Sequence, residues 1–291
     1  MFENSSMNSF PLLGGRWGWG CGASAKHRPV PADTLHPRPY PPPKRGRVTA
    51  RVVAIAAALL SATANAAEVK DILRTADDFR IYAQSAKVVT HVELYKDNQL
   101  DSARLYHVYV KPGRRSLVLF KTASELGQKM LMLDDKYWLM LPSSKRPLRI
   151  TATQKLLGEA SVGDIATMTW SEDYNGTIVG QETLQGVAAT KLELRSAREG
   201  TTYDRILLWV RADNFQPLQA ELYLASGKLA KTARYELGQL QGRAVITKTH
   251  LQDRIQLNRR TVLQYRSIEE AEIPDKLYNP AYLVRENLES W

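Results

Sequence analysis

Two kinds of hydrophobic periodicity divide the chain from residue 68 onward. Over 68–79 the apolar residues recur every three or four positions, which predicts an amphipathic helix that covers an apolar surface with one face. That face consists of Val69, Ile72, Leu73, Ala76 and Phe79. Further along, apolar and polar residues alternate over 86–95, 187–195, 217–224 and 229–237. Such alternation predicts strands with one face buried and the other in solvent.

Turn residues separate the alternating segments at intervals of about 10–12 residues, which is typical of an all-β fold. These intervals leave no room for the helices that connect parallel strands, so we expect an antiparallel sheet. We expect turns at Asp134-Asp135 and at four glycine pairs: Pro112-Gly113, Asn175-Gly176, Ser226-Gly227 and Gln241-Gly242. The pattern predicts about ten or eleven strands that form a barrel, an open barrel or a sandwich.

Two other segments lack the strand alternation. Residues 152–170 read as helix or loop, with Leu156, Leu157, Ile165 and Met168 as apolar positions. Near the C-terminus, Asn279-Pro280 combines a capping residue with a proline suited to a first helical turn, which predicts a short helix over 280–288. We therefore expect a single domain over 67–291: a helix, a long meandering sheet with a helical insertion, and a last short helix.

A secretory signal peptide is predicted at 48–66. Arg51 supplies a positive charge, residues 52–60 form an uncharged apolar run, and Ala64-Asn65-Ala66 ends it with small residues. This order is that of a cleavable signal, whereas a buried apolar helix would not explain it. We expect cleavage before Ala67. The apolar run is far shorter than the roughly 20 residues that span a bilayer, so we expect no permanent anchor.

Residues 1–47 do not resemble a folded domain. They hold eight of the fourteen prolines and the only cysteine, Cys21. Such a segment has too little apolar surface to offset the entropy lost on ordering, which predicts a disordered leader. A leader before a signal peptide also suggests an over-extended gene start, and we expect translation to begin near Val48.

Charge and cysteine content exclude some classes of protein. The net charge of the chain is +10, but residues 1–66 hold eight Lys or Arg and two Asp or Glu. About +4 therefore remains on the predicted domain, and a basic surface for nucleic acid is not expected. Because no cysteine follows Cys21, the domain has no disulfide and no cysteine for lipid attachment.

Motifs of catalysis and metal binding are absent from the predicted domain. His91, His107 and His250 each lie in a predicted strand, and no two are close enough in sequence to form a short-range ligand pair. Asp173-Tyr174-Asn175-Gly176 lacks the remaining ligands of a calcium loop and is typical of a β-turn, and Glu269-Glu270 of a solvated charge pair. We expect no catalytic residues, metal or cofactor.

All four methionines of the predicted domain fall between 130 and 168. Methionine adapts to irregular apolar shapes, so it suits a cavity for acyl chains but also fills ordinary cores. Both interpretations stay open. The candidate cavity lining is Met130, Met132, Trp138, Met140, Leu157, Ile165 and Met168. By strand alternation Trp138 and Met140 share one face and Leu139 and Leu141 the other, and either face can be the concave one.

Five segments together resemble a known family. They are 104–120 (RLYHVYVKPGRRSLVLF), 137–150 (YWLMLPSSKRPLRI), 158–166 (GEASVGDIA), 172–194 (EDYNGTIVGQETLQGVAATKLEL) and 203–235 (YDRILLWVRADNFQPLQAELYLASGKLAKTARY). In the last, a strand ends in a turn that contains Asp213, and a hairpin follows. From about residue 70 to 288 the chain resembles the LolA-like proteins, which sort lipoproteins to the outer membrane.

This resemblance implies a fold and a function. The fold is mainly β: an incomplete, strongly curved antiparallel β-barrel with helices covering its concave face. The function is that of a non-enzymatic periplasmic carrier, soluble after signal cleavage, whose apolar cavity binds acyl chains of lipoproteins or lipids for transport toward the outer membrane. Its partners would be lipidated cargo, an inner-membrane permease of ABC or RND type and an outer-membrane acceptor. We expect a monomer.

Two other functions stay open at this point. The same fold could serve as a regulatory or accessory module that senses lipid or lipoprotein for a membrane partner. A hydrolase with an unrecognised site is a further alternative, because pairs of acidic residues are common. The chain also departs from the known carriers by its greater length and by its segment 151–170, and no residue could be matched to the arginine that fastens their lid.

Overall fold

The computed structural model describes residues 67–291 except 82, 158–159, 166–168 and 289. The leader predicted for 1–47 and the signal peptide predicted for 48–66, with Ala64 and Ala66, lie outside the described residues, so both stay predictions. The described chain starts in a helix at Ala67. Among the described residues, no helix has both the length and the apolar character needed to cross a membrane.

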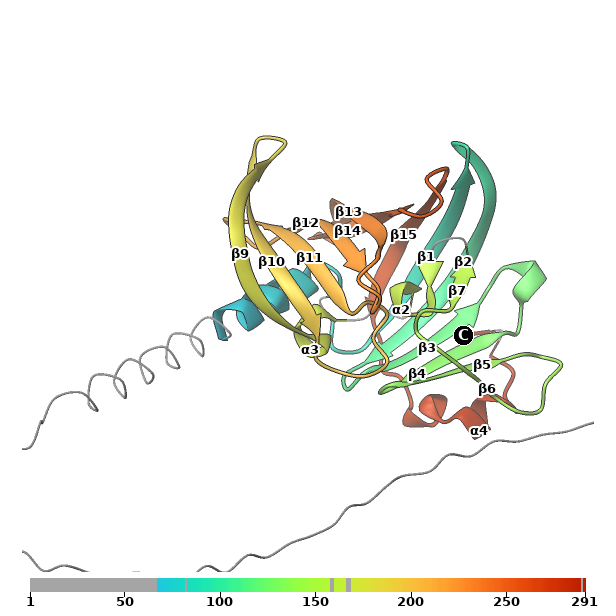
Figure 1. The fold of residues 1–291 in the computed structure, drawn as a ribbon. Helices are drawn as coiled ribbons and strands as arrows, with labels where there is room; N and C mark the ends of the chain where they lie inside the picture. Colours follow the sequence, from blue (N-terminus) through green and yellow to red (C-terminus); the bar gives the residue numbers. More distant parts are fainter. Residues whose placement is uncertain (1–66, 82, 158–159, 166–168, 289) are drawn as a thin grey trace, which may run out of the picture. The chain divides into compact units, whose positions relative to one another are not determined.

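Thirteen strands form one strongly curved antiparallel sheet (Figure 1). Their order is β6-β5-β4-β3-β2-β1-β15-β14-β13-β12-β11-β10-β9. Nearly all neighbours are consecutive in the chain, because short turns join antiparallel strands. The exception is β1, which pairs with β15 and joins the two halves. Within the described chain β6 and β9 are free edges, so the sheet stays open, which confirms the predicted fold class.

The bounds of the strands show which strands the alternation of apolar and polar residues predicted. The sheet consists of β1 (Ala86–Lys96), β2 (Gln99–Lys111), β3 (Arg115–Phe120), β4 (Lys129–Leu133), β5 (Lys136–Met140), β6 (Leu148–Ile150), β9 (Tyr174–Leu184), β10 (Val187–Ser196), β11 (Arg205–Arg211), β12 (Pro217–Tyr223), β13 (Leu229–Leu240), β14 (Arg243–Asp253) and β15 (Arg259–Glu270). A separate hairpin joins β7 (Lys155–Leu157) to β8 (Ala160–Ser161). The predicted strands are confirmed in β1, β10, β12 and β13. The expected ten or eleven was too few, since strands of two or three residues are too short to alternate.

The N-terminal helix (67–78) confirms the prediction for 68–79. Four of its five predicted apolar residues are buried: Val69, Ile72, Leu73 and Ala76. Phe79 lies just past the helix and is half-buried. Its carbonyl accepts a 2.7 Å hydrogen bond from the backbone N–H of Ile246, which fixes the end of the helix against β14.

Most predicted turns are confirmed, but the two that include Asn175-Gly176 are wrong. Asp134, Gln241 and Gly242 have positive φ in tight hairpin turns, as does Gly227. Asn175 and Gly176 instead lie within β9, so the turn predicted there, and the β-turn predicted for 173–176, are wrong. The physical reason is packing: a Cβ on Gly176 would lie 2.8 Å from Cγ1 of Val69 and 2.7 Å from Cδ2 of Leu194. Because Gly176 has no side chain, the N-terminal helix can pack closely against β9.

The C-terminal segment covers the outer face of the sheet. The side chain of Asn279 accepts hydrogen bonds from the N–H groups of Ala281 and Tyr282, which confirms the predicted cap. The helix itself, α4 (Pro280–Leu283), is shorter than the predicted 280–288. The chain leaves helical geometry early because Leu288 and Trp291 return to pack on the sheet. Short 3₁₀ turns occur at η1 (Ala123–Glu125) and η2 (Asp275–Tyr278).

Two apolar clusters pack on opposite faces of the sheet. The inner cluster lies on the concave face and includes the N-terminal helix, Ala160 of β8 and Ile165 of α2 (Val162–Ile165). The outer cluster joins β2–β5 to η2, α4 and the C-terminal residues. In Figure 1, α2 and β7 lie within the concavity, and α4 lies beyond β4 and β5.

Candidate functional site

An insertion, residues 151–173, connects the two free edges of the sheet. It leaves β6 at one edge and enters β9 at the other, so it crosses the opening that a closed barrel would not have. Its described parts are the β7–β8 hairpin and two helices of four residues each, α2 and α3 (Trp170–Asp173). Segment 152–170, predicted as helix or loop, is therefore a hairpin followed by short helices. The insertion occupies the concave face and is our candidate lid.

A buried polar cluster holds α2 on the sheet. The Nζ of Lys231 on β13 lies 2.8 Å from Oδ2 of Asp164 on α2. The hydroxyl of Tyr203 donates to the same carboxylate at 2.9 Å from Oδ1. Ser161 also donates, from its N–H at 2.9 Å and its hydroxyl at 2.7 Å. The carboxylate thus has a cationic partner and three further donors in a nearly dry environment, which holds α2 against the sheet.

The charges of this cluster are set by their neighbours. Burial disfavours the ionised form of Asp164, but Lys231 and Ser161 outweigh it and hold the pKa of Asp164 below its ordinary value. Burial, followed by the nearby carboxylate of Asp164, raises the pKa of Tyr203 well above its ordinary value. Tyr203 is therefore a neutral donor at any physiological pH.

The N-terminal helix holds the end of the insertion. Asp77 accepts hydrogen bonds from the backbone N–H groups of Trp170 and Ser171, each at 2.9 Å, and so caps α3. The guanidinium of Arg80 lies over the Trp170 ring, 4.6 Å from its centroid. Burial raises the pKa of Asp77 despite the opposing effect of Arg80. The α3 end of the insertion is therefore attached by backbone hydrogen bonds and by a cation–π contact.

Arg114 joins the two arms of the sheet at one rim. It follows Gly113 in the β2–β3 turn with a φ of 55°, and its side chain is 4% exposed. It pairs with Asp173 of α3 and lies 3.3 Å from Asp135 of the β4–β5 turn. The hydroxyl of Tyr137 donates to the carbonyl of Gly200, in the β10–β11 loop, at 3.2 Å. These contacts fix β2–β5 to β9–β11 below the lid.

A small cavity of about 40 Å³ remains under α2. Its aromatic lining is Trp170, Tyr203, Tyr235 and Tyr265, and its aliphatic lining is Ile206, Leu222, Ala233, Leu251 and Leu263. Burial raises the pKa of Tyr235 to a value outside the physiological range. The wall of this cavity is thus mainly apolar, with a few hydroxyl groups and the charged side chains of Arg80 and Asp164.

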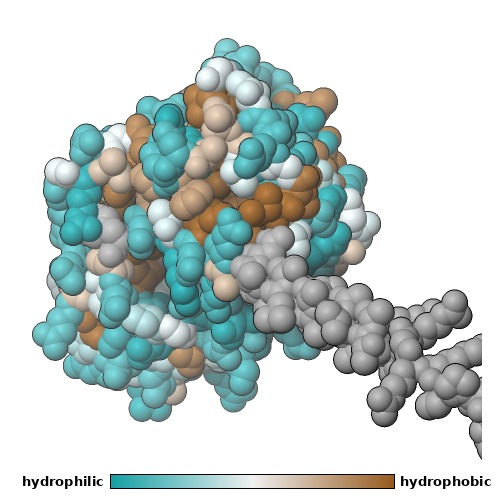
Figure 2. Space-filling view, turned by 90° about the vertical axis from the view of Figure 1, so that its left-hand side faces the viewer, coloured by the Kyte–Doolittle hydropathy of each residue, from teal (hydrophilic) through white to brown (hydrophobic). Residues whose placement is uncertain are grey.

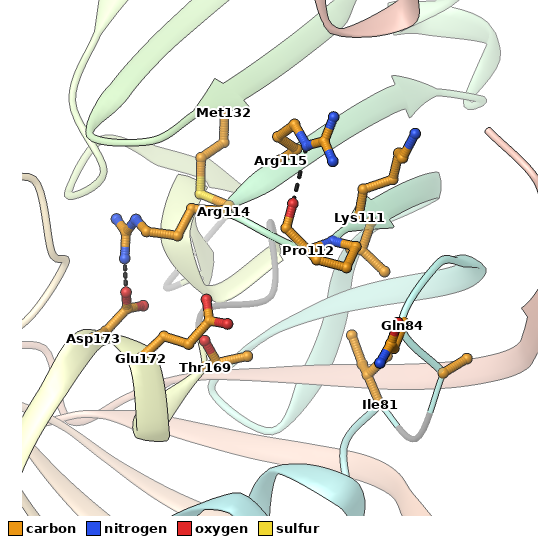
Figure 3. Close-up of a pocket in the computed structure, with 12 residues that line it drawn as sticks. Ile81, Gln84, Lys111, Pro112, Arg114, Arg115, Met132, Thr169, Glu172 and Asp173 are labelled. Atoms are coloured by element: carbon orange, nitrogen blue, oxygen red, sulfur yellow. Dashed lines mark hydrogen bonds and ion pairs between the residues drawn. The ribbon is translucent and has the colours of Figure 1, made fainter. Parts of the chain in front are cut away.

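A second cavity, of about 300 Å³, opens beside the cluster of Arg114 with Asp135 and Asp173, which we call the Arg114 hub (Figure 3). Apolar Ile81, Val110 and Met132 line it together with Arg114 and Asp173. Figure 3 shows Arg114 directed at Asp173 across the cavity wall. Met132 belongs to the inner cluster as well, so this cavity reaches the apolar interior from outside. Figure 2 shows hydrophobic residues gathered in a band on the side seen there, within a mainly hydrophilic surface.

The structure divides the predicted lining between the two faces. Met130, Met132 and Ile165 lie in the inner cluster, whereas Met140 and Trp138 belong to the outer cluster. Leu157 lies in β7, where its side chain is not described, and Met168 lies outside the described residues. Grouping all seven on one wall was therefore wrong for Trp138 and Met140. The reason is register: Met130 pairs with Leu139 and Met132 with Tyr137, so even positions of β4 face the same way as odd positions of β5.

Comparison with known proteins identifies the family. A LolA superfamily protein from Nitrosomonas europaea is 31% identical to this chain, and the match covers 73% of this chain and 97% of that one with a TM-score of 0.68. This chain belongs to the LolA superfamily. The resemblance found in the sequence is thus confirmed. A family described as "Uncharacterized protein" matches residues 113–285. A comparison with curated proteins finds no match.

Two further solved structures share the fold of this LolA superfamily member at 20% identity. A DUF1329 family protein from Desulfovibrio piger matches with a TM-score of 0.64, covering 75% of this chain and 99% of that one. An outer membrane lipoprotein-sorting protein domain from Vibrio parahaemolyticus matches with a TM-score of 0.60, covering 73% and 98%. At this identity the two show the fold alone.

Sequence reasoning missed the polar cluster of this LolA superfamily member. Asp164, Tyr203 and Lys231 form contacts between residues up to 67 positions apart in the sequence, and they belong to no recognisable motif. One signal was present: Lys231 alternates in phase with Ala233 and Tyr235, both of which lie in or against the inner cluster. A lysine at an inward position of a strand needs a partner, and that expectation points to a buried carboxylate.

Proposed function

We propose that this protein is a non-enzymatic carrier that takes acyl chains of lipoproteins or lipids onto its concave face. The observation that carries the proposal is the insertion: it crosses the open sheet between β6 and β9 and covers an apolar face. A cover of this kind can be exchanged for a ligand of similar polarity. Each CH₂ group that leaves water contributes about 0.8 kcal/mol, so a long chain offsets the contacts that α2 loses.

The contacts of the insertion suggest how the face is uncovered. Helix α2 contacts the sheet through its side chains, chiefly through the ion pair of Asp164 with Lys231. In α3 the backbone is bonded to Asp77, and Asp173 pairs with Arg114. We infer that α2 leaves while α3 stays in place. Met130 and Met132 of β4 would then contact the chain in the place that Ile165 of α2 leaves, and Trp138 and Met140 would support the same strands from behind.

The cellular setting is part of the proposal. The pattern of a cleavable signal at 48–66 supports export, and we propose that the domain acts in the periplasm. There it would receive cargo from an inner-membrane permease of ABC or RND type and deliver it to an outer-membrane acceptor.

Native mass spectrometry of the protein purified from its periplasm tests the carrier function. We expect a population heavier by the mass of an acyl lipid, and lipid extraction should identify it. The protein stripped of lipid should take up a fluorescent fatty acid. A protein that is free of lipid as purified and takes up no fatty acid would contradict the proposal.

Two adjacent residues give a matched pair of variants. Leu139 packs on the inner cluster and is half-buried, so Leu139→Asp should leave a folded protein that binds fatty acid poorly, because an unpaired charge in an apolar site is strongly disfavoured. Met140 is 2% exposed in the outer cluster, so Met140→Asp should chiefly lower the melting temperature. If both variants unfold, or both bind normally, the inner face is not the binding face.

A further inference from the structure

The carboxylate of Asp164 occupies a ready-made site for an anion on the concave face. Two of its partners belong to the wall of the site: Lys231 lies on β13, and Tyr203 lies at the end of the β10–β11 loop, two residues before β11. The third, Ser161, belongs to the insertion, like Asp164 itself. The side chains of Lys231 and Asp164 are only 5% and 10% exposed. The wall therefore contributes a cation and a hydroxyl donor, and the lid contributes the anion.

Displacement of α2 separates these groups. Asp164 leaves with α2 and Ser161 with the adjoining β8, whereas Lys231 and Tyr203 stay on the wall. The cross-strand neighbour of Lys231, Asp253, also stays, and its Oδ1 accepts from the N–H groups of Ile255 and Gln256. The wall thus loses one carboxylate next to a buried ammonium group. Removal of a carboxylate from beside a buried ammonium group is unfavourable, so a ligand that returns a negative charge to this point favours opening.

The surroundings of this point are mainly apolar, although Arg80 and Thr249 also line the cavity. Asp164 and Tyr203 line the small cavity together with aliphatic side chains of β11, β12, β14 and β15, namely Ile206, Leu222, Leu251 and Leu263. A ligand that enters here meets Lys231 and the Tyr203 hydroxyl at one place, with mainly aliphatic and aromatic side chains and the guanidinium of Arg80 around them. That combination suits a molecule with one anionic oxygen head and a long chain.

We propose that the ligand is an anionic amphiphile whose head replaces the Asp164 carboxylate between Lys231 and Tyr203, with its acyl chain along the concave face. This inference rests on the proposed carrier function and narrows it to chains that carry a carboxylate or phosphate head. Asp164 acts as an internal substitute for that head in the closed state. A neutral amphiphile of the same length opens the lid without restoring the lost charge, and it binds more weakly.

Displacement of a fluorescent fatty acid from the lipid-free protein tests this preference. The competitors are hexadecanoate and hexadecanol in one pair, and lysophosphatidate and monoacylglycerol with matched chains in the other. We expect the wild-type protein to bind the anionic member of at least one pair tenfold or more tightly. The pair with the larger ratio identifies a carboxylate or a phosphate head as the source of the charge.

Three variants separate the anion site from a structural role. Lys231→Met should bring the ratio close to one, and Tyr203→Phe, which removes only a hydroxyl, should reduce it severalfold. Asp164→Asn removes the competing charge and should tighten binding of the anionic probe severalfold. Lys248→Met is the control, because the partner of Lys248 is Glu236 at 3.5 Å on an exposed part of the sheet. Circular dichroism checks that each variant is folded.

The possible results point to different failures. If the wild-type protein binds no amphiphile, the carrier function itself is wrong. If it binds charged and neutral amphiphiles equally, or if Asp164→Asn weakens binding of the anionic probe in a folded protein, the anion site is wrong and the carrier function stands. A Lys231→Met protein that is folded and keeps the tenfold ratio overturns the inference as well.

Discussion

Gly176 of the edge strand β9 lies directly against Val69 of the N-terminal helix. A Cβ built on Gly176 would lie 2.8 Å from Cγ1 of Val69, closer than real Cβ atoms come to other heavy atoms. Val69 is 1% exposed and belongs to the inner cluster. The helix can therefore reach the apolar interior only because β9 has no side chain at this position.

This contact predicts that Gly176→Ala is destabilising. The added methyl forces Val69 or Leu194 to move, and overpacking of this kind typically costs about 1–3 kcal/mol. Gly180 lies on the same strand, and a Cβ there has no heavy atom within 4 Å. Gly180→Ala should leave the free energy of unfolding unchanged or raise it slightly. Urea unfolding of both variants checks the difference, and equal effects would refute the packing argument.

The buried ion pair of Arg114 with Asp173 predicts that removal of the Arg114 charge strongly lowers the free energy of unfolding. Arg114→Met leaves Asp173, 1% exposed, without its guanidinium, and removal of one partner of a buried pair costs about 3–5 kcal/mol. Arg115→Ala is the control: its partner Asp275 is 76% exposed, so the loss should stay within about 1 kcal/mol. The double variant Arg114→Met with Asp173→Asn should recover part of the stability. Similar losses for the two single variants would show that Arg114 does not join the arms.

The pair of Asp164 with Lys231 predicts a pH dependence of stability. Because the pKa of Asp164 is lower in the folded protein than its ordinary value, the unfolded chain binds the proton more tightly. The contribution of the pair is therefore fully present above about pH 4, the ordinary value for aspartate. It is lost as the pH falls through the folded value. Comparison of wild type with Asp164→Asn by thermal melting should show the difference in stability shrinking below pH 4, and a difference that grows there would contradict the assignment.

The export signal predicts the start of the mature chain. Signal peptidase should cut before Ala67, within about two residues, because small residues occupy the positions that it recognises. N-terminal sequencing of the periplasmic protein checks this. A mature chain that keeps residues 48–66 would contradict it.

The fold was largely predictable, because its signals are local. Alternation over 86–95 predicted β1, and the spacing of Val69, Ile72, Leu73 and Ala76 predicted the helix. Asn175-Gly176 misled the prediction because a glycine in a strand has the same local appearance as a glycine in a turn. Its true role depends on Val69, more than 100 residues earlier in the sequence, which no local pattern reports.

The site was less predictable, because it depends on register and on distant pairs. The turn at Asp134-Asp135 was predicted, and a two-residue turn places Leu133 opposite Lys136. That register alone separates Met132 from Met140, so the division between faces could have been derived. The pairing of Asp164 with Lys231 could not, because it joins the insertion to a strand 67 residues away.

Photolabelling tests the central claim most directly. The lipid-free protein is loaded with a long-chain fatty acid that carries a photoreactive group in its chain, irradiated and mapped by peptide mass spectrometry. The account predicts labels on the inner face, at Met130 or Met132, and none at Met140 of the outer cluster. An excess of the unlabelled fatty acid should abolish the labels. Labels confined to Met140, Trp138 and the C-terminal segment would contradict the claim that the concave face takes up the acyl chain.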